Sequence, residues 1–152
     1  MKVSAADVAE QVREEGPFAF RRRMLGAAAG AQKLGCSLME LPPGKVSWPS
    51  HYHLANEEAV YVLEGEAVLR LGSDEHVLRP GHYVALPKGP PARRLENRSD
   101  APCRYLAVST MIEPEVGIYP DSGKIGVFAR KTEGFAELHE RAAQVDYWKG
   151  EK

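Results

Sequence analysis

Two histidines and a glutamate in the segment SHYHLANEEAVYVLEG, residues 50–65, have the types and the spacing of metal ligands. Side chains alternate along a strand, so His51 and His53 would lie on one face, about 6.6 Å apart along the backbone. Two imidazoles at that separation can converge on one ion at about 2.0–2.1 Å each. Glu58 begins the next apolar run and could return beside them. Such a donor set suits Fe(II), Mn(II), Ni(II) or Zn(II) better than Mg²⁺ or Ca²⁺.

The same segment also has an ordinary structural interpretation. A His-x-His pair is weak evidence by itself, because His51 and His53 could simply be exposed on an edge strand. Glu57 stands next to Glu58 and could be the ligand instead. The spacing to Gly65 favours Glu58, which leaves Glu57 as a solvated neighbour.

A wider pattern supports the metal interpretation. It reads Gly44-x6-His51-x-His53-x4-Glu58-x6-Gly65, followed by Pro80-Gly81-x5-Pro87-x-Gly89 and Asn97. These two blocks resemble the two motifs of the cupin superfamily, over roughly residues 38–108, and the chain looks closest to small bacterial single-domain cupins of unassigned activity. The resemblance implies a double-stranded β-helix, a small jelly-roll barrel with its ligand site inside. It also places His51, His53 and Glu58 at three of the four metal-ligand positions.

The fourth position of the motif departs from the family pattern. Counting back from Asn97 gives Arg93 where a histidine is expected, and counting on from Gly89 gives Ala92; the Asn97 anchor favours Arg93. A guanidinium stays protonated and cannot coordinate a cation. Three arrangements are then open: Arg93 points away from the ion, a Glu58–Arg93 ion pair replaces the metal, or an anionic ligand bridges the metal and Arg93. A bound metal is therefore expected but could be absent.

The elements that must position these residues are short strands. Apolar runs broken by turn residues recur every 8–12 positions, which favours an antiparallel sandwich or barrel and an all-β fold. A stripe of apolar residues over 4–15 predicts a short N-terminal helix that ends at Gly16-Pro17. The tail is expected to contain a loop, a turn and one strand over 113–131, then a short helix within 133–143. The predicted strands are 18–25, 32–41, 45–48, 50–54, 58–64, 66–71, 75–78, 82–86, 92–96 and 103–110.

The chain of 152 residues is expected to form a single cupin domain. Its barrel core would span about 32–110, with an N-terminal extension over 1–31 and a C-terminal extension over 111–152. The formal net charge of −1 gives no overall field that would favour nucleic acid or an anionic membrane. We expect a cytoplasmic protein, because no apolar stretch approaches the roughly 20 residues of a membrane span and the first residues are too polar for a signal peptide.

Arg21-Arg22-Arg23 is the only basic run in the sequence. A solvated strand edge is the favoured interpretation of this triplet, and a phosphate-binding patch is the alternative.

The residues allow several functions. The first is a metal-dependent enzyme acting on a small polar or anionic molecule, with Arg93 gripping a carboxylate or phosphate and Tyr61 and Trp48 lining the pocket. The alternative for Tyr61 and Trp48 is that they are ordinary core or interface residues. The others are a binding or sensing barrel without catalysis, and a structural or partner-binding protein, because the fold alone does not choose among activities. The resemblance further implies a homodimer. The apolar tail residues Val145, Tyr147 and Trp148 are candidates for packing against the barrel or against that partner.

Overall fold

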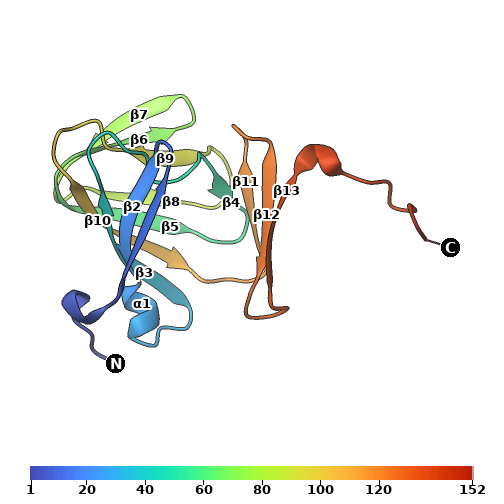
Figure 1. The fold of residues 1–152 in the computed structure, drawn as a ribbon, viewed down its shortest axis with the longest axis horizontal. Helices are drawn as coiled ribbons and strands as arrows, with labels where there is room; N and C mark the ends of the chain where they lie inside the picture. Colours follow the sequence, from blue (N-terminus) through green and yellow to red (C-terminus); the bar gives the residue numbers. More distant parts are fainter. Residues whose placement is uncertain (152) are drawn as a thin grey trace.

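The computed structural model describes residues 1–151 and is built almost entirely of antiparallel strands, which confirms the predicted all-β jelly-roll barrel (Figure 1). The strands are β1 (Glu10–Glu15), β2 (Phe18–Arg23), β3 (Leu34–Leu41), β4 (Tyr52–His53), β5 (Glu58–Glu64), β6 (Ala67–Leu71), β7 (Asp74–Leu78), β8 (Tyr83–Leu86), β9 (Arg93–Glu96), β10 (Cys103–Thr110), β11 (Glu115–Tyr119), β12 (Lys124–Ala129) and β13 (Phe135–Glu140). Three short helices complete the fold: η1 (Ala5–Asp7), α1 (Leu25–Ala28) and η2 (Arg141–Ala143).

Three sheets form the molecule. The largest has the strand order β1-β2-β3-β10-β5-β8, and the smaller ones have the orders β13-β12-β11-β4 and β7-β6-β9. Strands far apart in the sequence are neighbours, since β10 lies between β3 and β5. Single bridges from Val46 to Glu96 and from His51 to Arg93 join the irregular segment 45–51 to β9. Within the predicted strand over 45–48, only Val46 forms a β-bridge, so this segment is not a strand.

The hydrophobic core lies inside the barrel. Buried apolar side chains come from the inner face of the largest sheet and from the β6–β9 layer opposite; they include Met39, Leu41, Val62, Leu69 and Leu95. Along β5, Val60 and Val62 are buried, whereas Tyr61 and Leu63 are exposed. This alternation is what a sheet with one face on the core requires.

The N-terminal helix predicted over 4–15 is wrong. Only Ala5–Asp7 form a helical turn, and Glu10–Glu15 form β1, which pairs with β2 along its whole length. The apolar stripe has helical spacing, but pairing with β2 satisfies the backbone groups of β1 and sets Glu10 opposite Arg23. Gly16-Pro17 is therefore the turn of a hairpin rather than a helix stop, and Gly16 has the positive φ of +56° that this turn needs.

The tail also differs from the prediction. It holds two strands, β11 and β12, where one was expected, and β13 takes the place of the predicted short helix. The edge of β12 offers unpaired backbone groups that β13 satisfies, and such long-range pairing outweighs local helix propensity. Residue 25, predicted as the end of the strand over 18–25, instead begins α1.

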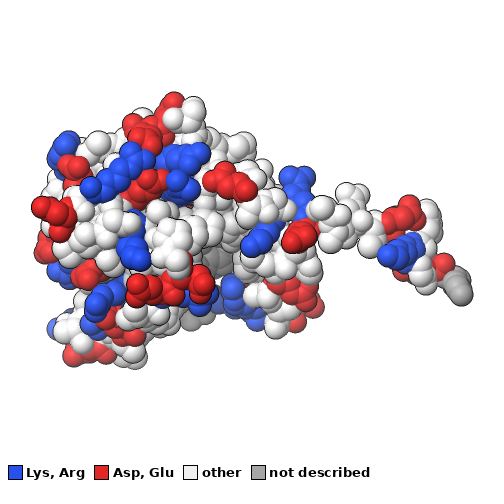
Figure 2. All heavy atoms as spheres, turned by 45° about the horizontal axis from the view of Figure 1, so that its top comes forward, with Lys and Arg blue, Asp and Glu red and all other residues white. Residues whose placement is uncertain are grey.

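The last residues do not pack against the barrel of their own chain. Tyr147 is 81% exposed and Trp148 is 71% exposed, and Figure 1 shows the segment after η2 running away from the barrel. A partner for them, and with it the homodimer, stays a prediction. On the face drawn in Figure 2, acidic and basic side chains are interspersed. Within residues 1–151, no helix has the length and hydropathy needed to span a membrane.

Replacing Val62 with alanine is expected to lower the free energy of unfolding by about 2 kcal/mol, because it removes two buried methyl groups and leaves a cavity. Tyr61→Ala is the matched control on the opposite face of β5 and should cost less than about 1 kcal/mol. Urea denaturation of both variants measures these values. Equal losses would contradict the assignment of the two faces.

Candidate metal centre

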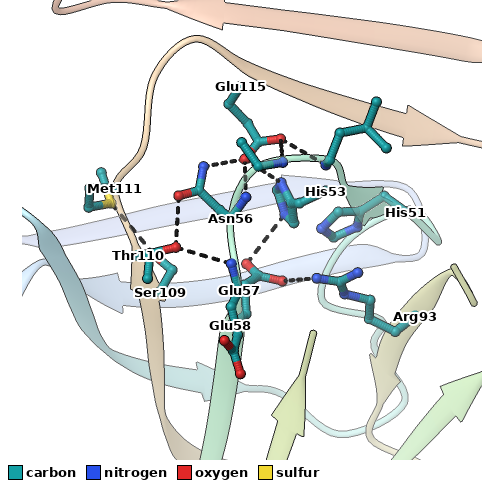
Figure 3. A network of polar contacts seen from close by, with 12 residues as sticks. His51, His53, Asn56, Glu57, Glu58, Arg93, Ser109, Thr110, Met111 and Glu115 are labelled. Atoms are coloured by element: carbon teal, nitrogen blue, oxygen red, sulfur yellow. Dashed lines mark hydrogen bonds and ion pairs between the residues drawn. The ribbon is translucent and has the colours of Figure 1, made fainter. Parts of the chain in front are cut away.

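Two strand ends and one bridged segment bring together the three predicted metal ligands (Figure 3). His51 pairs with Arg93 through two backbone hydrogen bonds, His53 ends β4, and Glu58 begins β5. One donor atom from each of His51, His53 and Glu58 lies within 4.8 Å of the other two. Donors held about 2.1 Å from one ion lie at most about 4.2 Å apart, so a small contraction would close the site on a metal.

The two imidazoles are largely buried and differ in their partners. Nδ1 of His51 lies 2.8 Å from the carbonyl oxygen of Pro49, so a proton on Nδ1 would donate to that carbonyl and leave Nε2 free as a ligand. Both ring nitrogens of His53 are buried and have no hydrogen-bond partner among the described residues. Carboxylate oxygens lie near both nitrogens, with Glu58 Oε1 at 3.4 Å from Nε2 and Glu115 Oε2 at 3.8 Å from Nδ1, but neither contact has hydrogen-bond geometry. Buried polar atoms are normally hydrogen-bonded, so His53 has unused capacity to bind a ligand.

Glu58 connects the histidines to Arg93. Its Oε1 lies 3.4 Å from Nε2 of His53, and its Oε2 lies 3.1 Å from Nη2 of Arg93. Arg93 is only 3% exposed, and its Nε lacks a partner within the described part of the chain. Arg93 therefore does not point away from the site, because its guanidinium forms an ion pair with Glu58. One carboxylate oxygen thus holds the guanidinium while the other faces the imidazoles.

The protonation states suit metal binding. Burial acts to raise the pKa of Glu58, but the His53 contact and the charge of Arg93 outweigh it and lower that pKa to about 2. Burial also lowers the pKa of His51 below its ordinary value. At neutral pH Glu58 is therefore an anion and His51 a neutral imidazole, which are the forms that coordinate cations. The residues present fit a divalent transition metal.

A buried glutamate that the sequence did not single out holds the segment between the ligands. The carboxylate of Glu115, on β11, accepts hydrogen bonds from the backbone N–H of Leu54, Ala55 and Asn56 at 3.1, 3.3 and 2.8 Å. It also accepts one from the side-chain amide of Asn56. The amide oxygen of Asn56 in turn accepts hydrogen bonds from Thr110 Oγ1 and the backbone N–H of Ile112. Figure 3 shows this network directly beside His53.

His51, His53 and Glu58 line a cavity of about 480 Å³ inside the barrel. Trp48 lines it, with its ring centroid 4.2 Å from that of Phe20. Tyr61 is not among the cavity residues; it is 40% exposed on the outer face of β5, opposite Val60 and Val62. The structure therefore brings Trp48 and Arg93 to the cavity with the metal ligands but does not bring Tyr61 there. Tyr119 of β11, which the sequence did not suggest, stacks on His51 at 5.6 Å.

Known proteins with the same architecture were found by sequence and by structure. The Cupin_2 family (cupin domain) matches residues 37–109. A sugar phosphate isomerase of the cupin superfamily from Silicibacter pomeroyi superposes with a TM-score of 0.84 at 27% identity, covering 94% of both chains.

Two further relatives come from Streptomyces. The polyketide cyclase RemF from Streptomyces resistomycificus superposes with a TM-score of 0.65 at 28% identity, covering 76% of this chain and 82% of its own. The tetracenomycin polyketide synthase protein TcmJ from Streptomyces glaucescens is 27% identical over 74% of this chain and 73% of its own. The barrel, the motif spacing and these similarities agree, and residues 37–109 of this chain are a cupin domain.

Proposed function

We propose that this protein is a metal-dependent enzyme that acts on a small, polar, anionic molecule inside the barrel, and that its reaction is the isomerisation of a sugar phosphate. One observation carries the proposal: two imidazoles and one carboxylate converge within 4.8 Å at a cavity large enough for such a substrate. The similarity to the isomerase from Silicibacter pomeroyi supports the reaction class, because it extends over nearly the whole of both chains.

The roles of the residues follow from their geometry. His51, His53 and the Oε1 atom of Glu58 would hold the ion, and Arg93 would fix the other oxygen of Glu58. When bound, the ion supplies a Lewis acid that polarises a carbonyl or hydroxyl oxygen of the substrate. The cavity walls, which include Trp48, are mainly apolar, so polar contacts made inside are less screened than at the open surface.

Untagged protein loaded with Fe(II), Mn(II), Ni(II) or Zn(II) is expected to retain about one ion per chain, and His51→Ala should lose it, because two remaining donors hold an ion far less tightly than three. Metal content measured by elemental analysis after gel filtration tests this prediction. His76→Ala is the control, since His76 is an exposed histidine on β7. Loaded wild-type protein should interconvert an aldose phosphate and a ketose phosphate.

Failure of the wild type to retain any of the four metals would contradict the proposal. It would favour the second candidate, a metal-free barrel that binds or senses a small molecule without catalysis. The Glu58–Arg93 ion pair favours that candidate, because it already gives the carboxylate a cationic partner. Metal retention that is equal in wild type and His51→Ala would place the ion elsewhere.

A further inference from the structure

The three arginines of the only basic run face different ways. In β2, Arg21 and Arg23 form ion pairs with Glu10 at 3.3 and 3.1 Å on the outside of the sheet. Arg22 lies between them and points to the other face of the sheet, the face that also carries the buried Phe20. Its partner across the strand pair is the buried Met39. Strand alternation therefore turns one guanidinium of the three inward, and Arg22 lines the same cavity as the metal ligands.

The charge of Arg22 is not compensated by a carboxylate. Its guanidinium contacts the side-chain oxygen of Gln11 at 2.9 and 3.2 Å and the sulfur of Met24 at 3.4 Å, and both of these partners are neutral. Within residues 1–151, no carboxylate oxygen lies within 4.0 Å of it. A half-buried arginine without a counter-ion has lost part of its hydration. Charge-assisted hydrogen bonds to a bound anion would compensate for that loss.

The other arginines of the cavity are already neutralised. Arg93 is paired with Glu58, and Arg94 is paired with Glu96 at 2.6 Å. Lys131, by contrast, lines the cavity and donates only to the carbonyl oxygen of Gln32, at 3.4 Å, among the side-chain contacts of the described residues. Uncompensated positive charge in this cavity thus comes from Arg22 and Lys131, and Arg93 is a weaker anion site than its sequence position suggests.

We infer that Arg22 binds the phosphate group of a phosphorylated small molecule in this cavity, with Lys131 adding to the positive field. This inference rests on the proposed function, in which the sugar end of the same molecule would reach His51, His53 and Glu58. The planar guanidinium of Arg22 can give a phosphate two parallel N–H donors and stays charged at any relevant pH. The basic triplet is therefore a solvated strand edge at two positions and an anion site at the third.

Calorimetric titration with glucose 6-phosphate tests this assignment on the full chain, with glucose as the uncharged reference. Wild type is expected to bind glucose 6-phosphate at least 10-fold more tightly than glucose, and Arg22→Met should weaken glucose 6-phosphate binding at least 10-fold. Arg21→Met is the matched control on the outer face and should stay within twofold of wild type. Thermal melts of each variant establish that it is folded.

Two further variants separate this inference from the proposed function. His51→Ala should lose the metal, and in that background Arg22→Met should still weaken glucose 6-phosphate binding at least 10-fold, which would support Arg22 as the phosphate site even if the metal centre failed. A loss of binding in Arg93→Met with no change in Arg22→Met would overturn the inference and restore Arg93 as the anion site. Equal weakening by Arg21→Met and Arg22→Met would also overturn it, because it would show only a general effect of surface charge.

Discussion

Replacing Glu115 with alanine is expected to lower the free energy of unfolding by about 3–5 kcal/mol and to remove metal binding. The carboxylate accepts backbone hydrogen bonds from three consecutive residues, 54–56, and lies in a 5% exposed position. Each buried donor left without an acceptor costs about 1–3 kcal/mol, and water entering the gap would recover part of the sum. The segment 54–56 joins His53 to Glu58, so its release should also disperse the ligands.

Urea denaturation and metal content measure the two effects of Glu115→Ala. Glu57→Ala is the matched control, because Glu57 lies in the same segment but is exposed, and it should change neither quantity appreciably. Glu115→Gln keeps the shape and one acceptor oxygen, so its loss of stability should be intermediate. A loss below about 1 kcal/mol in Glu115→Ala would show that the network does not hold the segment.

Replacing Arg93 with histidine is expected to tighten divalent-metal binding about 100-fold, which corresponds to roughly 2.7 kcal/mol. A guanidinium about 5 Å from a divalent ion would repel it by on the order of 7 kcal/mol at an effective dielectric constant near 20, and Glu58 offsets part of that repulsion. The substitution removes the repulsion, frees Oε2 of Glu58 and offers a third imidazole at the family's fourth ligand position. Competition with a chelating dye measures the affinity.

Arg93→Met separates charge from coordination, because it removes the guanidinium without adding a ligand and should give only part of the gain. Arg94→His is the control at the neighbouring position, where the arginine is paired with Glu96 rather than with Glu58. An affinity for Zn(II) that is unchanged or weaker in a folded Arg93→His protein would show that residue 93 does not face the ion.

The barrel strands and the clustering of His51, His53 and Glu58 could be predicted because their signals are local. Alternation of apolar and polar residues, with turn residues between the runs, located β5 and β10 to the residue. The spacing of His51 and His53 put both on one face, and the distance to Gly65 chose Glu58 over Glu57. The structure brings these three donors together as expected.

The remaining features depend on contacts between distant parts of the chain. Glu115 lies about 60 residues from the segment that it holds, and nothing in its own surroundings marks it as buried. Segments 10–15 and 135–140 became strands because β2 and β12 offered them backbone partners, which a local helical pattern does not reveal. The prediction that Tyr61 lines the pocket is wrong, because the alternation of side chains shows which residues share a face of a strand but not which face points into the barrel.

The sequence by itself thus determined the fold class, the cupin domain and the candidate donor set, because the period of a strand and the spacing of a motif are local properties. Only the tertiary structure decided how the charges are matched. It paired Arg93 with Glu58, set Arg21 and Arg23 against Glu10, and left Arg22 facing the cavity without a carboxylate. The physical reason is that charge compensation depends on distances of a few ångströms between strands, and those distances exist only once the sheets have formed.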